Sequence, residues 1–180
     1  MRHKMPGVKG KAKKIFRTDL GWAGIAVSDS GVALVVLPRK DRKSVGRELN
    51  SREPGVRSSA GEAERLLSKA VVLLQKYFSG DAVAFDLPLD TRYYTAFQQS
   101  VWKAASAIPF GETRSYAWIA GRIRNPHAAR AVGQALGANP IPVIIPCHRV
   151  IGSSGSLGGF SGGIGMKKVL LKRERGHGRR

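Results

Sequence analysis

The sequence predicts a mixed α/β protein in two parts, in which strands and a helix come first and a mostly helical half follows. Two β-branched apolar runs, residues 21–27 and 32–37, flank a polar turn at 28–31 and predict an antiparallel hairpin. Apolar residues recur at helical spacing after residue 60, and the chain beyond residue 90 is helical in pattern. With 180 residues and 42% hydrophobic content, the chain is long enough to bury a core.

The first half begins with basic residues 1–17, which predict a frayed cationic tail before the hairpin. Pro38 ends the second strand, and the polar residues 39–60 predict a long loop or irregular connection. A helix follows that ends at Gly80, and residues 83–85 predict a returning strand. The apolar face expected for that helix is Leu67, Ala70, Val71, Leu74 and Phe78.

A domain boundary is expected where Pro88 interrupts the chain, which divides it into an amino-terminal α/β domain at 1–86, a second domain at 87–175 and a basic tail at 176–180. In the second domain a helix is expected to follow a Thr91 cap and to run to Ile108. Two shorter helices are expected, one capped by Ser115 and one at 125–136. This pair predicts a helix-turn-helix, although its Ala and Gly residues are also compatible with simple close packing of helices.

The charge balance favours a polyanionic partner. Lys and Arg number 31 against 12 Asp and Glu, a formal net charge of +19, so nucleic acid is the expected partner. A solvated basic surface is the alternative, but few acids are present for ion pairing. No apolar run of 18 residues and no apolar signal-peptide core occurs, so we expect no membrane association and a cytoplasmic location, with a nuclear one left open.

Cys147, the single cysteine, lies in the pentapeptide Pro-Cys-His-Arg-Val at residues 146–150. One sulfur excludes an internal disulfide and a four-thiolate metal site, which leaves a nucleophile beside His148 or a buried inert thiol. Three prolines at 140, 142 and 146 predict an extended or turning approach to it. The Gly-rich residues 152–163 resemble a flexible linker in composition, and a closing helix follows with Met166, Val169, Leu170 and Glu174.

These motifs resemble the active domain of the O6-alkylguanine-DNA alkyltransferases. The resemblance rests on Pro-Cys-His-Arg-Val, the preceding Asn-Pro-Ile-Pro at 139–142, Arg-Ala-Val-Gly at 130–133 and Ser-Gly-Gly at 161–163. It spans roughly residues 87–174. It implies that the amino-terminal half is the small, ribonuclease H-like α/β domain of that family.

The resemblance assigns the chemistry to Cys147, which would accept the alkyl group. His148, a bridging water and Glu174 would activate the thiol, as in other relays of nucleophile, base and acid. Tyr116 would donate a proton to a ring nitrogen so that neutral guanine leaves. Asn139 would hold the turn between the DNA-binding helix and the thiol segment.

The resemblance also implies how DNA is bound. Arg130 would enter the base stack when the damaged nucleotide is flipped out, and its helix would lie in the minor groove. Small flanking residues would let the backbone approach, and the expected DNA-binding set is Ser115, Ala129, Arg130, Ala131 and Gly133. The backbone of Cys147 would help bind the base, and the expected substrate pocket is Pro142, Val150, Gly158, Phe160 and Ser161.

The expected function is therefore DNA repair by irreversible, single transfer of an alkyl group from O6-alkylguanine in duplex DNA to Cys147. No cofactor is expected, and no metal, because the zinc-binding members of the family use cysteines that are lacking here and His3 with His127 offers no credible site. Phe160 replaces a tyrosine found in many members, so only packing or stacking is expected of it. We expect a monomer, with cooperative assembly on DNA and activity on O4-alkylthymine left open. A non-catalytic module that binds alkylated DNA and a cysteine hydrolase are the alternatives.

Overall fold

The computed structural model describes residues 12–51 and 60–176, which form two compact units, Met1–Thr91 and Arg92–Arg180. The division falls later than the boundary predicted before residue 87. Residues 88–90 pair with the first unit, since the amide of Val32 donates to the carbonyl of Pro88 and the amide of Asp90 donates to the carbonyl of Val32, both at 2.8 Å. The predicted basic tail at 176–180 lies outside the described residues except for Gly176.

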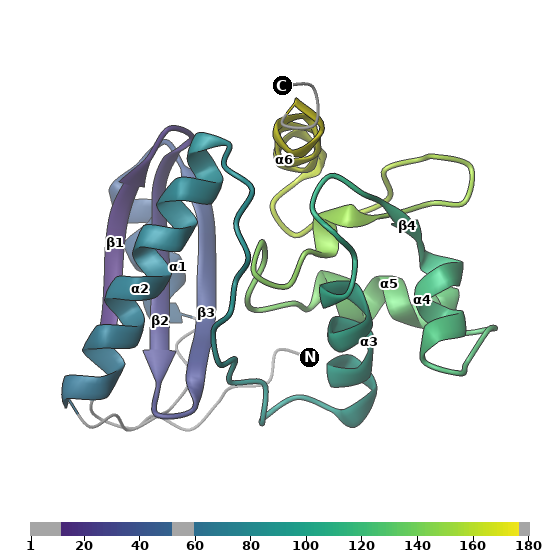
Figure 1. Ribbon diagram of the computed structural model, residues 1–180, viewed down its shortest axis with the longest axis horizontal. Coiled ribbons are helices and arrows are strands. Elements are labelled where there is room, and N and C mark those ends of the chain that lie inside the picture. The colour runs from purple at the N-terminus through teal and green to yellow at the C-terminus, as the bar shows by residue number, and fades with distance from the viewer. Residues whose placement is uncertain (1–11, 52–59, 177–180) are drawn as a thin grey trace. The chain divides into compact units, whose positions relative to one another are not determined.

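A three-stranded antiparallel sheet forms the centre of the first unit (Figure 1). Its strands are β1 (Ala12–Thr18), β2 (Gly21–Ser28) and β3 (Gly31–Arg39), in the order β1-β2-β3. The predicted β2-β3 hairpin is confirmed, but the predicted cationic tail is wrong from residue 12 onward. Phe16 and Thr18 of β1 are buried while Lys13, Lys14 and Arg17 are exposed, as in a protected edge strand. Residues 1–11 of the predicted tail lie outside the described residues.

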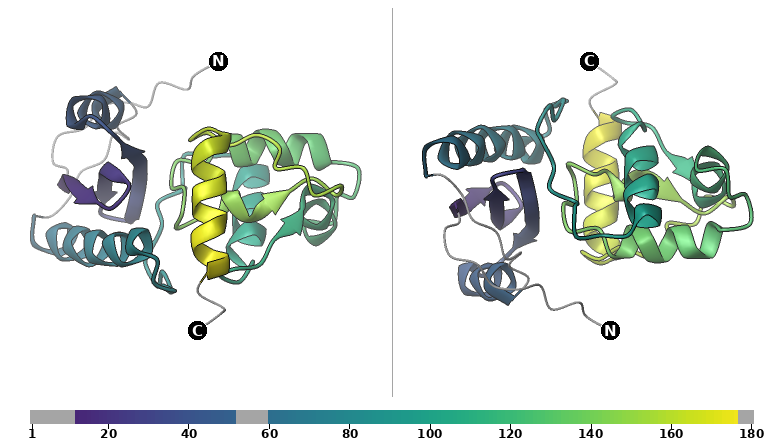
Figure 2. Two further views of the ribbon diagram at one scale, coloured as in Figure 1. Left: turned by 90° about the horizontal axis from the view of Figure 1, so that it is seen from above. Right: turned by 90° about the horizontal axis from the view of Figure 1, so that it is seen from below.

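Helices α1 (Arg42–Ser51) and α2 (Ala60–Ser79) cover opposite faces of this sheet (Figure 2). The loop predicted at 39–60 is wrong where α1 forms; residues 52–59 lie outside the description. The Asp41 carboxylate accepts hydrogen bonds from the amides of Lys43 and Ser44 at 3.0 and 2.8 Å, which caps α1. Val45 and Leu49, one helical turn apart, then pack on the sheet.

The predicted apolar face of α2 is confirmed, because all five of its residues are buried. Gly80 follows the helix with φ 110°, a conformation that favours glycine. The strand predicted at 83–85 is wrong. Residues 81–88 are irregular, and Leu89 instead forms an isolated bridge with Val32.

The second unit is mostly helical. It contains α3 (Ala96–Ser106), β4 (Arg114–Ser115), α4 (Tyr116–Arg122), α5 (Ala129–Gly137), the 3-10 turn η1 (Cys147–Arg149), β5 (Val150–Ile151) and α6 (Ile164–Gly176). Thr95 rather than Thr91 caps α3, because its hydroxyl accepts from the amide of Gln98 while the Gln98 side chain accepts from the amide of Thr95. Ser115 caps α4 as predicted. Helix α5 begins at Ala129, after the position predicted from Asn125 and Pro126.

Helices α3, α4 and α5 contact one another around buried Val101, Trp102, Ile119, Val132 and Leu136. The Trp102 indole donates to the carbonyl of Ala135 at 2.9 Å, which ties α3 to α5. Residues 123–128 join α4 to α5, and the helix-turn-helix assignment of this pair stays a prediction. Among the described residues, no helix is long and apolar enough to cross a membrane.

Candidate active site

The side chain of Asn139 stabilises the turn that leads from α5 to Cys147. The Asn139 side chain accepts from the amide of Ile141 at 2.9 Å and donates to the carbonyl of Ile145 at 3.0 Å and to Cys147 Sγ at 3.1 Å. Within this turn, buried Val143 has φ 78°, a strained conformation for a β-branched residue. The side chain of Asn139 thus connects the end of α5 directly to the sulfur.

Cys147 opens η1 and is only 4% exposed. Burial raises the pKa of its thiol to about 11, while the Asn139 hydrogen bond and the nearby charge of Lys167 act in the opposite direction. The resting group at neutral pH is therefore a protonated thiol. Its use as a nucleophile requires a base that removes the proton when the substrate is bound.

His148 and Glu174 supply a candidate base and its partner. His148 Nε2 lies 2.7 Å from Glu174 Oε1, and both side chains are buried. Burial lowers the pKa of His148 below its ordinary value of 6.5, although the Glu174 hydrogen bond and charge oppose the shift. A lowered pKa keeps the imidazole neutral at pH 7, the form that accepts a proton.

Arg149 also contacts Glu174, an interaction that the sequence does not predict. Its Nε donates to Oε2 at 2.9 Å and its Nη2 donates to Oε1 at 3.0 Å. The amide of Gly111 also donates to Oε2 at 3.0 Å. The position of Arg149 within the Pro-Cys-His-Arg-Val motif was the only signal for this contact in the sequence.

Lys167 of α6 is fully buried and was likewise not predicted. Its ammonium donates to the carbonyl of Val150 at 2.6 Å and to that of Leu157, which links α6 to the Gly-rich segment. Burial lowers the pKa of Lys167, and the charge of Cys147 acts to raise it. The expected apolar face of α6 is partly wrong because Val169 is 38% exposed; the buried residues are Lys167, Leu170, Leu171 and Glu174.

Tyr116 lies between α5 and the Gly-rich segment. A Cβ on Gly158 would stand 2.5 Å from the Tyr116 hydroxyl, and one on Gly133 would stand 3.6 Å from its ring. Gly158 also has φ 61°, so a side chain there would be strained as well as obstructed. Burial and then the charge of Cys147 raise the pKa of Tyr116, which keeps its hydroxyl protonated and able to donate.

The other predicted pocket residues differ in their surroundings. Pro142 and Val150 are buried. Phe160 places its ring edge-to-face with that of His148, with 6.4 Å between the centroids. Ser161 is exposed, and no hydrogen bond of its side chain defines a role.

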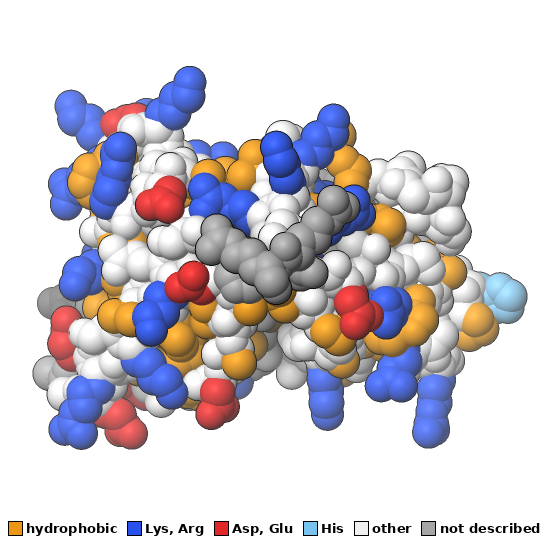
Figure 3. Space-filling view, turned by 45° about the horizontal axis from the view of Figure 1, so that its top comes forward, with side chains coloured by type: hydrophobic (Ala, Val, Ile, Leu, Met, Phe, Trp, Pro, Cys, Tyr) orange, Lys and Arg blue, Asp and Glu red, His pale blue; other side chains and the backbone are white. Residues whose placement is uncertain are grey.

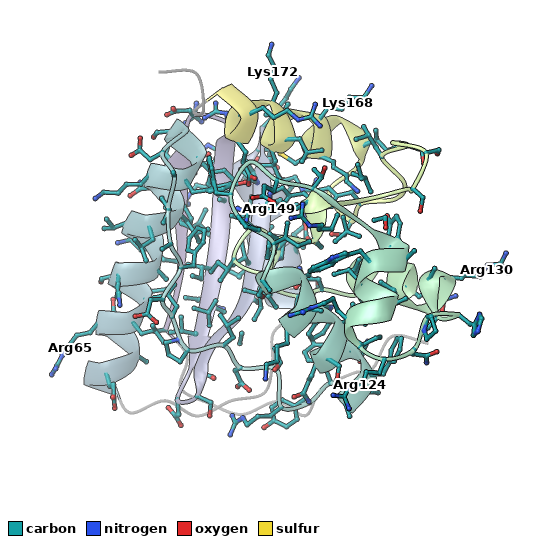
Figure 4. The ribbon with its side chains drawn as sticks, turned by 45° about the vertical axis from the view of Figure 1, so that its right-hand side comes forward. Arg65, Arg124, Arg130, Arg149, Lys168 and Lys172 are labelled. Atoms are coloured by element: carbon teal, nitrogen blue, oxygen red, sulfur yellow. The ribbon has the colours of Figure 1, made fainter. Side chains whose placement is uncertain are left out.

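The predicted DNA-binding residues lie on the surface of α5 and at the start of α4. Arg130 points outward from α5 (Figure 4), Ala131 is exposed, and Ala129 and Gly133 are half-buried. The Ser115 hydroxyl accepts from the amide of Trp118 at 3.0 Å, so it is engaged in capping α4. Figure 3 shows Lys and Arg side chains protruding over the face drawn there, in keeping with the excess of positive charge.

Metal ligation has little support in the part of the chain that the structure describes. No group of three or more His, Cys, Asp or Glu side chains there could hold a metal ion. His127 is exposed, and His3 lies outside the described residues. The expected absence of a metal stays a prediction.

Residues 96–176 match the family model described as 6-O-methylguanine DNA methyltransferase, DNA binding domain. A methylated-DNA–protein-cysteine methyltransferase of Mycobacterium bovis is 57% identical over 108 residues, a match covering 60% of this chain and 65% of the relative. The protein of that name from Mycolicibacterium paratuberculosis is 45% identical over 83% of this chain and 90% of its own length. The crystal structure of Mycobacterium tuberculosis OGT in complex with DNA matches with a TM-score of 0.72 at 41% identity, over 91% of this chain and 92% of that one. The chain therefore belongs to the methylated-DNA–protein-cysteine methyltransferase family.

Proposed function

We propose that this protein repairs DNA by transferring the alkyl group of O6-alkylguanine to Cys147, once per molecule. The observation that carries the proposal is the arrangement of a buried thiol bonded to Asn139 next to the buried pair His148 and Glu174. Its relatives bear the name methylated-DNA–protein-cysteine methyltransferase, which supports the same reaction here.

In the proposed reaction, the thiol proton passes through a water to His148 as the substrate enters. A sulfur lone pair then forms the bond to the alkyl carbon while the bond from that carbon to O6 breaks, and the electron pair passes into the base. Tyr116 donates a proton to a ring nitrogen and is reprotonated by the proton that left the thiol. The products are S-alkylcysteine and neutral guanine, and because a thioether is not readily hydrolysed, the protein is consumed.

Duplex DNA is the proposed substrate, bound through its minor groove by α5. The base must leave the stack to reach a buried sulfur, and Arg130 is the long outward-pointing side chain of that helix that could fill the space left behind. Ala129 and Gly133 are small, so the backbone of α5 could approach the DNA closely. A net charge of +19 supplies the nonspecific attraction to phosphates.

Intact and peptide mass spectrometry tests the proposal after incubation with a duplex oligonucleotide bearing one O6-methylguanine. We expect one added methyl group per protein, located on the peptide that contains Cys147. Tight binding with unchanged mass would instead indicate a damage-recognition module. Continued turnover of an ester or peptide substrate would indicate a hydrolase, and either result would overturn the proposal.

Replacing Arg130 with Ala is expected to slow methyl transfer from duplex DNA by about 10- to 100-fold, because filling the vacated stack is worth a few kcal/mol. The reaction with free alkylated base needs no flipping and should change little. Single-turnover rates with the two substrates measure the difference. Lys168→Ala removes one exposed positive charge from α6 and serves as the control; equal losses with both substrates would exclude a flipping role for Arg130.

Replacing Tyr116 with Phe is expected to slow transfer by about 100-fold or more without weakening DNA binding, because proton donation to the leaving base is lost while the ring is retained. Single-turnover rates at saturating protein and the dissociation constant for unmodified duplex provide the two readouts. Tyr93→Phe, at a tyrosine that is 50% exposed, is the matched control. A Tyr116→Phe protein with the original rate would remove Tyr116 from the mechanism.

A further inference from the structure

We propose that Arg149 is a positioning residue, which keeps Glu174 ionised and thereby holds a proton on Nε2 of His148, so that Nδ1 is the atom that takes the thiol proton. The inference rests on the proposed function and assigns a role to a residue that the nucleophile, base and acid of that mechanism do not include. It concerns which ring nitrogen of His148 carries the proton, and which is free to accept one, in the reactive form.

Arg149 forms a buried, bidentate ion pair with Glu174. Its side chain is 9% exposed and that of Glu174 is 1% exposed. The guanidinium donates to both oxygens of the carboxylate, and this bidentate geometry fixes the carboxylate plane as a lysine could not. Figure 4 shows Arg149 within the second unit, whereas Arg124, Arg130, Lys168 and Lys172 extend outward.

The same guanidinium also fixes Glu174 relative to neighbouring elements. Its Nη1 donates to the carbonyl of Ile108 at 2.7 Å, just beyond the end of α3, and its charge lies 5.6 Å from the centre of the Phe110 ring. The Gly111 amide donates to the Glu174 carboxylate from the same loop. Arg149 therefore holds η1, the 108–111 loop and α6 in one arrangement around the carboxylate.

The ionisation state of Glu174 determines which nitrogen of His148 carries the proton. A buried carboxylate without a cation favours its protonated form, and a protonated Glu174 would donate to Nε2. His148 would then carry its own proton on Nδ1 and could not accept another there. With Arg149 in place, the carboxylate stays an acceptor, Nε2 keeps the proton, and Nδ1 becomes the basic nitrogen.

The charged and titratable groups around His148 are Glu174 and Lys167 on α6, Arg149 and Cys147 on η1, and Tyr116, which interacts with Cys147. Burial is the main cause of the lowered pKa of His148; Glu174 acts to raise this pKa, and the charges of Arg149 and Lys167 lower it further. Arg149 therefore has two opposing effects: it disfavours an imidazolium directly, and it preserves the carboxylate that stabilises one. The tautomer, rather than the charge alone, distinguishes its role from that of a structural ion pair.

The test combines nitrogen-15 NMR of His148 with single-turnover methyl transfer in the intact protein and in Arg149→Met and Arg149→Lys. We expect the Nε2–H tautomer in the original protein and a gain of the Nδ1–H tautomer in Arg149→Met. Methyl transfer at pH 7.5 should fall about 100-fold in Arg149→Met, the usual contribution of a positioned base, and less in Arg149→Lys. Arg175→Met, at an exposed arginine of α6, is the control that should change neither readout.

The pH dependence provides a readout that a purely structural role would not change. Because the thiol pKa is about 11, hydroxide removes its proton increasingly as pH rises, and the need for His148 declines. The deficit of Arg149→Met should therefore shrink between pH 7.5 and 9.5, while the affinity for unmodified duplex stays the same. A deficit that is constant with pH would overturn the proposal.

Two further outcomes would contradict it. One is the Nδ1–H tautomer in the original protein, and the other is an unchanged rate per folded molecule in Arg149→Met. If Arg149→Met does not fold, the tautomer of the original protein and the rate of Arg149→Lys decide the question. Failure of the original protein to accept a methyl group would reject the proposed function, whereas the NMR comparison would still decide whether Arg149 sets the tautomer.

Discussion

Cys147→Ala is expected to abolish methyl transfer completely while leaving the affinity for duplex DNA within about twofold. The chain contains one cysteine, so no second thiol can accept the group. Cys147 is nearly buried, and the exposed Arg130 that we assign to DNA binding is not altered by the substitution. Mass spectrometry after incubation with an O6-methylguanine duplex measures transfer, and a gel-shift titration with the same duplex measures binding.

Cys147→Ser makes this test more stringent because it keeps a side chain of similar size that can accept from Asn139. The serine hydroxyl is a far weaker acid than a thiol, so His148 cannot produce an effective nucleophile from it. We expect no methylated product from either variant. Methylation of any other residue in the Cys147→Ala protein would show that the reacting atom had been assigned wrongly.

The parts of the fold that could be predicted are those whose apolar pattern is strong over a long window. The continuous apolar runs of β2 and β3, which are buried over most of their length, and the helical repeat of α2 are examples. In these elements local sequence and tertiary packing favour the same structure. For Cys147 the residues alone left a nucleophile or a buried inert thiol open, and the family resemblance assigned the nucleophile, which stays a prediction.

Strand β1 and helix α1 could not be predicted because their local signals are weak. Three of the seven residues of β1 are charged, and its few inward residues become a pattern only when they are paired with β2. In α1, Gly46 and several cations obscure the single pair Val45 and Leu49 that contacts the sheet. Both elements form because of their contacts with the rest of the sheet, which the local sequence does not reveal.

In the candidate site, too, local sequence could not predict two buried side chains. Lysine and arginine are rarely buried, so Lys167 and Arg149 would ordinarily be assigned to the surface. Their burial depends on acceptors distant in sequence, namely the carbonyls of Val150 and Leu157 for Lys167 and Glu174 for Arg149. A sequence pattern contains no information on such partners unless a resemblance supplies it.

Glu174→Gln is expected to lower the free energy of unfolding of the second unit by about 3–5 kcal/mol, the usual result of removing one partner of a buried ion pair. Gln keeps the shape of the side chain but removes the charge that balances Arg149, and its amide NH₂ cannot accept from the guanidinium. Denaturant titration by tryptophan fluorescence measures the effect. A Trp22→Phe background restricts the signal to Trp102 and Trp118, which both belong to this unit.

Glu112→Gln is the matched control, because Glu112 lies 2.6 Å from Arg114 but its side chain is 47% exposed. A surface pair of this kind contributes about 0–1 kcal/mol and is screened by salt, whereas the loss in Glu174→Gln should persist in high salt. Adding Arg149→Met to Glu174→Gln should restore part of the lost stability, since most of the loss arises from a buried cation without its anion. Additive losses in the double variant would mean that Glu174 stabilises the unit through Gly111 and His148, and that its pairing with Arg149 contributes little.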